Sequence, residues 1–128
     1  MIFNAQKTKG ANFKGTLTFD QVDINIGDGF DGSSGIFKVP VTGTYKMNFS
    51  GQSGRNEINY TFILFYKNGS VMFEISDVDT AENAKGKNVS YTWIMTLVKG
   101  DELKLESVNY LCVFSDEPLT FSGELIHI

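Results

Sequence analysis

Apolar and polar residues alternate with a period of two along most of the chain. Residues 45–50 (YKMNFS) place apolar side chains at odd positions and polar ones at even positions, and residues 89–93 (VSYTW) do the same. Alternation of this kind is typical of a β-strand with one face in water. No segment shows the three-and-four spacing of an amphipathic helix, so the pattern predicts an all-β domain.

Glycine-rich clusters separate the alternating segments. The clearest turn is Lys67-Asn68-Gly69-Ser70, because an Asn-Gly pair supplies the two positive φ values of a type I′ hairpin turn. Ten strands in one domain, residues 1–128, are the expected architecture, and that number predicts a sandwich or jelly roll. The expected strands are 3–6, 14–18, 21–25, 35–39, 43–51, 58–67, 70–76, 88–98, 102–109 and 120–128.

Two of these segments are apolar on both faces. Residues 60–66 (YTFILFY) and 93–98 (WIMTLV) carry large apolar side chains at successive positions. A two-layer sandwich covers one face of each strand, so we expect other copies of the same chain to cover the second. A fully enclosed strand, or a scatter of ordinary exposed hydrophobic residues, is the alternative.

Charge and hydropathy exclude several partners. The 128 residues carry a net charge of −4 and include a single arginine, Arg55, which disfavours a nucleic-acid surface or an anionic membrane surface. The apolar runs are far shorter than the roughly 20 residues of a membrane helix, so no membrane insertion is expected. The first residues lack the pattern of a signal peptide, so a targeting segment has been removed or never existed.

The chain offers little for catalysis or for redox chemistry. Its only thiol is Cys112, which cannot form an internal disulfide, and its only histidine is His127, near the end of the last predicted strand. A buried inert thiol and a packed or surface histidine explain both, so we expect no enzyme activity. Four Asn-x-Ser/Thr sequons favour a secreted protein, although a polar β surface also generates them by chance. They begin at Asn48, Asn59, Asn68 and Asn88.

Eight residues stand at characteristic separations along the first part of the chain: Phe19, Asn25, Phe30, Phe37, Gly43, Tyr45, Met47 and Phe49. This set resembles the signature of the C1q globular head domain, within the superfamily that includes tumour necrosis factor. Other fragments are similar too, from Phe3-Asn4-Ala5 at the start to residues 121–126 (FSGELI) at the end. Methionine stands at position 47 where the family pattern has phenylalanine, an apolar exchange that a core can absorb.

The resemblance implies a ten-strand jelly-roll β-sandwich, C1q/TNF-like, assembling as a homotrimer or as one chain of a C1q-like heterotrimer. The first and last strands would then lie in the inner sheet. A ligand-stacking aromatic platform is the alternative role for the aromatic members of the set. The residues expected in the core or the trimer interface are Phe3, Phe37, Tyr45, Phe49, Phe121, Leu125 and Ile126.

Calcium is the metal that the sequence best accommodates, because its ligands are carboxylate, amide and carbonyl oxygens. By resemblance, Asp77 or Asp79 matches an aspartate with which some family members bind calcium near the trimer apex. A second ligand does not align, because this loop is about three residues longer, which leaves Glu82 doubtful. A solvated acidic loop is the alternative, and Asp116 with Glu117 forms a weaker cluster.

The expected function is that of a secreted, extracellular, non-enzymatic recognition protein of innate immunity, a lectin-like pattern-recognition head. Three identical weak sites would bind surface carbohydrate or protein ligands multivalently. The proposed ligand contacts are Asp77, Asp79, Glu82 and Asn83. Two alternatives stay open: a structural trimerisation head for a collagen-like or matrix protein, and a signalling ligand for a cell-surface receptor.

Overall fold

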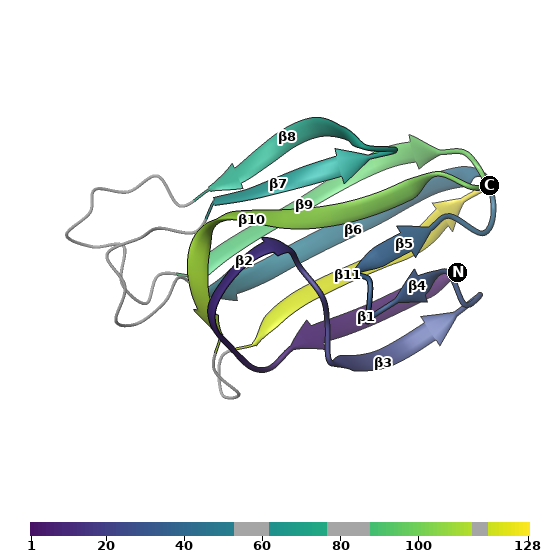
Figure 1. Cartoon of the computed structure of the whole chain (residues 1–128). Coiled ribbons are helices and arrows are strands. Elements are labelled where there is room, and N and C mark those ends of the chain that lie inside the picture. The colour runs from purple at the N-terminus through teal and green to yellow at the C-terminus, as the bar shows by residue number, and fades with distance from the viewer. Residues whose placement is uncertain (53–61, 77–87, 114–117) are drawn as a thin grey trace.

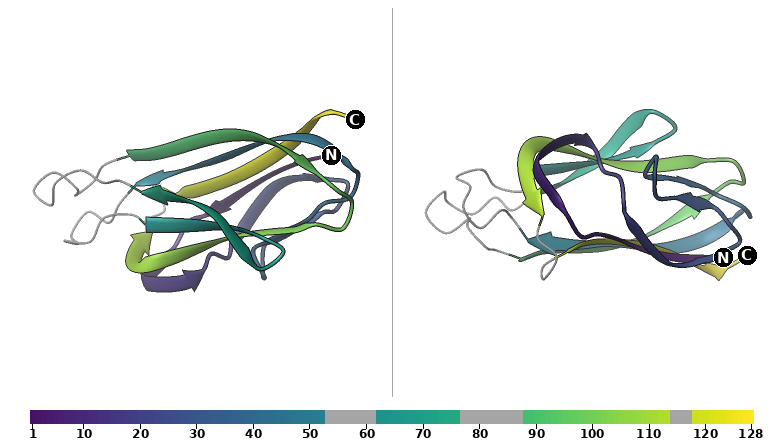
Figure 2. Two further views of the ribbon diagram at one scale, coloured as in Figure 1. Left: turned by 90° about the horizontal axis from the view of Figure 1, so that it is seen from above. Right: turned by 60° about the horizontal axis from the view of Figure 1, so that its bottom comes forward.

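The computed structural model describes residues 1–52, 62–76, 88–113 and 118–128, and every regular element in these ranges is a β-strand. The strands form two sheets that pack face to face, and both termini lie at the same end of the sandwich (Figures 1 and 2). The described residues thus contain no helix of the length and hydropathy needed to cross a bilayer. The all-β prediction is confirmed.

All pairings in the two sheets are antiparallel, and the chain crosses repeatedly from one sheet to the other. The first sheet has the order β3 (Gln21–Ile26), β1 (Ile2–Lys7), β11 (Leu119–His127), β6 (Gly43–Gln52) and β9 (Asn88–Leu97). The second sheet has the order β4 (Phe30–Asp31), β5 (Ile36–Lys38), β10 (Glu102–Val113), β7 (Phe62–Lys67) and β8 (Ser70–Ser76), and β2 (Gly10–Thr16) pairs with β10.

The ten predicted strands are present, and the described residues contain one more, the two-residue strand β4. The Asn25 side chain holds β4 in place. Its Nδ2 donates to the Phe30 carbonyl oxygen at 2.8 Å, and the Phe30 backbone amide donates to Asn25 Oδ1 at 3.2 Å. Asn25 thereby holds Phe30 in an extended conformation beside β5. The predicted strand 58–67 begins at Phe62, and its first four positions lie outside the described residues.

Aromatic rings from both sheets fill the space between them. The Phe3 ring stacks on Phe30 with centroids 4.6 Å apart and meets the edge of Phe121 at 5.1 Å, while Phe37 meets Tyr45 at 5.8 Å. Burial of these rings supplies much of the hydrophobic stabilisation of the fold. Phe3, Tyr45, Phe49 and Phe121 are fully buried and Phe37 is nearly so, whereas Leu125 is partly buried against this core and Ile126 is 47% exposed.

Gly123 in β11 has no side chain because Phe3 and Met47 take its space. A Cβ atom at this position would lie 2.7 Å from Phe3 Cε1 and 2.9 Å from Met47 Cε. Met47, at the position where the family pattern has phenylalanine, is fully buried. The flexible thioether therefore fills the core directly under the glycine.

The strands that are apolar on both faces bury only one of them within the protomer. In β7, Ile63 and Phe65 are fully buried, and Leu64 between them is half-buried on the other face. In β9, Trp93 packs against the core while the next residue, Ile94, is 62% exposed. The second face of β9 is thus uncovered in the single chain.

Candidate functional site

The acidic segment expected to bind ligand or calcium lies outside the described residues. Asp77, Asp79, Glu82 and Asn83 fall between the end of β8 at Ser76 and the start of β9 at Asn88. The weaker cluster of Asp116 and Glu117 lies outside them as well. The structure therefore leaves these ligand and calcium assignments as predictions.

The residues with catalytic potential are not brought together by the described part of the chain. Within it, no group of three or more His, Cys, Asp or Glu side chains could hold a metal ion. His127 is exposed at the end of β11, and Cys112 lies in β10.

The outer face of the first sheet carries a row of side chains that crosses all five strands. Register places Ile26 opposite Ile2, Ile2 opposite Glu124, Glu124 opposite Lys46, and Lys46 opposite Ile94. Ile26 and Ile94, at the two ends, are 63% and 62% exposed. We call these five residues the cross-sheet row: it is apolar at both ends, with one negative and one positive charge near the middle.

A second, more polar row runs beside the cross-sheet row. It places Ile24 opposite Asn4, Asn4 opposite Ser122, Ser122 opposite Asn48, and Asn48 opposite Thr92. Thr92 Oγ1 donates to Asn48 Oδ1 at 2.8 Å, whereas the buried Asn4 Oδ1 has no partner among the described residues. The polar row and the three middle residues of the cross-sheet row line a hollow of about 350 Å³ in this sheet face.

The outer face of the second sheet has a different character. Lys104 Nζ lies 5.0 Å from the centroid of the Tyr66 ring, a cation–π contact within the sheet surface. Desolvation and the neighbouring Glu106 carboxylate raise the pKa of the Tyr66 hydroxyl. On this face, the Tyr66 ring thus has its cationic partner, Lys104, on a neighbouring strand of the same sheet.

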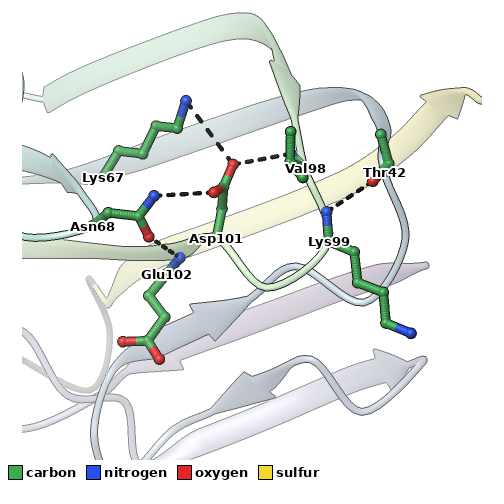
Figure 3. Close-up of polar contacts among 7 residues, drawn as sticks. All are labelled: Thr42, Lys67, Asn68, Val98, Lys99, Asp101 and Glu102. Carbon is green, nitrogen blue, oxygen red and sulfur yellow. Dashed lines mark hydrogen bonds and ion pairs between the residues drawn. The ribbon is translucent and has the colours of Figure 1, made fainter.

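The β7–β8 turn and the connection between β9 and β10 are tied together at one end of the sandwich (Figure 3). The Asn68 amide group donates to Asp101 Oδ1 at 3.0 Å, and Asn68 Oδ1 accepts from the Glu102 amide at 2.8 Å. Asp101 Oδ2 accepts from the Val98 amide at 2.9 Å and lies 3.9 Å from Lys67 Nζ. The Val98 bond, followed by the Asn68 bond, holds the pKa of Asp101 below its ordinary value.

The predicted Asn-Gly turn lies within this tie. Asn68 has φ +51° and Gly69 has φ +82°, as a type I′ turn requires. Both ends of the Asn68 carboxamide are engaged, so one predicted sequon has a structural role in the hairpin. Alternation and turn signals located this end of the molecule, but the hydrogen bonds that join the β7–β8 hairpin to the crossover between β9 and β10 are visible only in the fold.

A buried lysine, Lys7, is the last residue of β1. Lys7 is 6% exposed, and its ammonium donates to the Thr18 carbonyl oxygen at 3.2 Å and to Thr18 Oγ1 at 3.4 Å. Desolvation lowers the pKa of Lys7, which the negative charge of Asp20 partly opposes. Lys7 thus anchors the connection between β2 and β3.

The two sheets and their order define a jelly roll of the kind seen in complement and TNF-like proteins. The structure aligns with the globular domain of zebrafish complement 1qA over 98% of this chain and 97% of that one, with a TM-score of 0.76 at 21% identity. It aligns with murine APRIL over 97% and 98% of the two chains, with a TM-score of 0.69 at 11% identity.

The family model for the C1q domain matches residues 2–126, and the chain belongs to this family. Complement C1q tumor necrosis factor-related protein 3 of Mus musculus is 29% identical over 102 residues, and its Homo sapiens counterpart is 28% identical over 102 residues. Each match covers 80% of this chain and 40% of the relative, so the chain spans less than half of their length.

Family membership confirms the resemblance found in the signature residues. Domains of this family are non-enzymatic recognition or signalling modules, and trimer assembly is typical of them. Sequence reasoning indicated that one face of residues 93–98 is uncovered, but it did not indicate the other members of the outer face of the first sheet or its hollow. Its members lie far apart in the chain, and only the strand register brings them into line.

Proposed function

We propose that this domain is a secreted, extracellular, non-enzymatic recognition module that binds microbial or other surface ligands, carbohydrates included, as a trimeric head. The observation that carries the proposal is the C1q-domain match over residues 2–126. Three copies of one weak site on a rigid head bind a repetitive surface much more tightly than one site does.

The outer face of the first sheet is the proposed assembly surface. Ile26 and Ile94 would remain largely in water in a single chain, and Ile24 is 42% exposed beside them. Covering such residues is the usual driving force of association. Sedimentation at low micromolar concentration tests this part: a trimer is expected, and a monodisperse monomer would refute it.

The proposed ligand contacts are Asp77, Asp79, Glu82 and Asn83, with Asp77 and Asp79 as calcium ligands. Carboxylate oxygens are the ligands that calcium prefers, and the same groups accept hydrogen bonds from sugar hydroxyls. The support is the polar composition of the segment and the match of Asp77 or Asp79 with one aspartate of the family's loop.

The test is binding of the purified protein to an array of microbial glycans and cell-wall polymers, with calcium and again with a chelator. We expect selective binding that the chelator abolishes, and loss of binding in Asp77→Asn and Asp79→Asn. Asp23→Asn, an exposed acid on the edge strand β3, is the control and should bind normally. Binding that survives the chelator would discard calcium while retaining recognition.

A receptor-binding signalling ligand is the second candidate function, and the C1q domain is compatible with it as well. A structural trimerisation head is the third. Absence of binding to every glycan in both conditions would overturn the recognition proposal. Binding to a cell surface that is sensitive to protease treatment of the cells would then support the receptor ligand.

A further inference from the structure

The two charges in the cross-sheet row stand opposite each other without pairing inside the chain. Register places Glu124 directly across from Lys46, and both side chains are exposed. No ion pair or hydrogen bond joins either side chain to another group among the described residues. Each charge is therefore available to a group outside the protomer.

The row carries both partners of a charge pair between apolar ends. It reads apolar, apolar, negative, positive, apolar from Ile26 through Ile2, Glu124 and Lys46 to Ile94. A second copy can meet the negative charge with its positive one and cover the exposed isoleucines with its own. A partner of single sign, such as an anionic polymer, would match one charge and oppose the other.

We propose that Lys46 of one copy pairs with Glu124 of the next and that this contact makes the assembly self-selective, favouring a homotrimer over a mixture with related chains. The inference rests on the trimer proposed above. Each protomer of a closed ring uses its Lys46 on one side and its Glu124 on the other, so three identical chains satisfy every charge. A related chain that lacks either charge leaves one unpaired.

The role of such a pair is selection more than tight binding. Two charges lose their hydration when an interface closes, which offsets much of their attraction, whereas like charges brought together are strongly disfavoured. The isoleucines at both ends of the row supply the apolar contact. Specificity then comes from excluding chains with the wrong charge.

Charge reversal in the intact chain tests the proposal. Lys46→Glu and Glu124→Lys each bring like charges together at every interface, and each should raise the concentration at which trimers form by about a hundredfold or more. The double variant Lys46→Glu/Glu124→Lys restores opposite charges between copies and should recover the trimer. Analytical ultracentrifugation across a dilution series gives the readout.

The second sheet offers a matched control. Glu102 and Lys38 are also cross-strand partners, and both are exposed on its outer face. Lys38→Glu and Glu102→Lys should therefore leave assembly unchanged. Circular dichroism checks the fold of every variant. If a reversal unfolds the chain, the milder Glu124→Gln replaces it and should weaken the trimer about tenfold, since it leaves a Lys46 unpaired.

The outcomes separate this inference from the trimer proposal. A monomeric wild-type protein would refute the trimer, and this inference with it. A wild-type trimer with single reversals that assemble normally would refute the Lys46–Glu124 pairing alone. Failure of the double variant to recover the trimer lost in folded single variants would also refute it, because the two charges would then contact different groups.

Discussion

Replacing Asp101 by asparagine should loosen the tie that joins the turns at one end of the sandwich. The carboxylate accepts hydrogen bonds from the Val98 amide and the Asn68 carboxamide and lies near Lys67. Asparagine keeps the shape, removes the charge and turns an N–H group toward one of the two donors. One hydrogen bond is then lost and the other becomes neutral.

The magnitude follows from these contacts. A hydrogen bond to a charged group contributes about 1.5–3 kcal/mol, and a neutral one about 1 kcal/mol. The Asp101 side chain is 14% exposed, so water compensates only part of the loss. We expect a destabilisation of about 2 kcal/mol, which corresponds to a fall in melting temperature of roughly 6–10 °C for a chain of this size.

The loss of stability in Asp101→Asn should depend on pH in a characteristic way. Because the pKa of Asp101 is lower in the folded protein than the ordinary value of 3.8, the carboxylate contributes stability above that value and loses it as the pH falls through the folded pKa. The difference in free energy of unfolding between the wild type and Asp101→Asn should be constant from pH 5 to 7. It should shrink below about pH 4.

Urea denaturation followed by Trp93 fluorescence measures the difference, because the ring packs 5.0 Å from Phe65 in the core. Protein concentration must be the same in all samples, since assembly shifts apparent stability. Glu102→Gln is the control: the exposed side chain changes, and the backbone amide still donates to Asn68. Equal stability of the two variants, or a difference that does not begin to shrink as the pH falls below about 4, would refute the reasoning.

Three further expectations concern the core and the loop. Gly123→Ala should lower the free energy of unfolding by about 1–3 kcal/mol, because its methyl group overlaps Phe3 and Met47; thermal melting checks this, and an unchanged midpoint contradicts it. Tyr45→Phe should cost about 1 kcal/mol in urea denaturation, because its hydroxyl donates to the Val41 carbonyl at 2.6 Å; a variant as stable as the wild type would show that bond to be dispensable. Saturating calcium should raise the melting temperature by mass action, and no shift would remove the proposed site.

Local signals in the sequence were sufficient to place every strand of the described residues except β4. Alternation in residues 45–50 marks β6, and the Asn68-Gly69 pair fixes the hairpin between β7 and β8. Strand β4 escaped prediction because it is two residues long and is held by the Asn25 side chain, a contact without periodicity. The alternation of apolar and polar residues shows which side chains face the core, and a strand of two residues is too short to show such alternation.

The cross-sheet row shows what local patterns do not reveal. Ile26, Glu124 and Ile94 lie on three separate strands of one sheet and become aligned only through the strand register. Reading residues 93–98 as apolar on both faces correctly indicated an uncovered surface, as the exposure of Ile94 shows. The pattern could not indicate which charges accompany that surface, because strand order is set by packing across the whole chain.

The position of β11 between β1 and β6 has a consequence for folding during synthesis on the ribosome. The centre of the first sheet is its last-synthesised strand, so the β3–β1 and β6–β9 pairs remain two separate ribbons until residues 119–127 have left the exit tunnel. Until then Phe3 and Phe49 lack the strand that lies between theirs, and the nascent chain exposes apolar surface of the kind that chaperones bind. The first sheet can therefore be completed only once residues 119–127 are available, and deletion of β11 would leave two ribbons where one sheet should be.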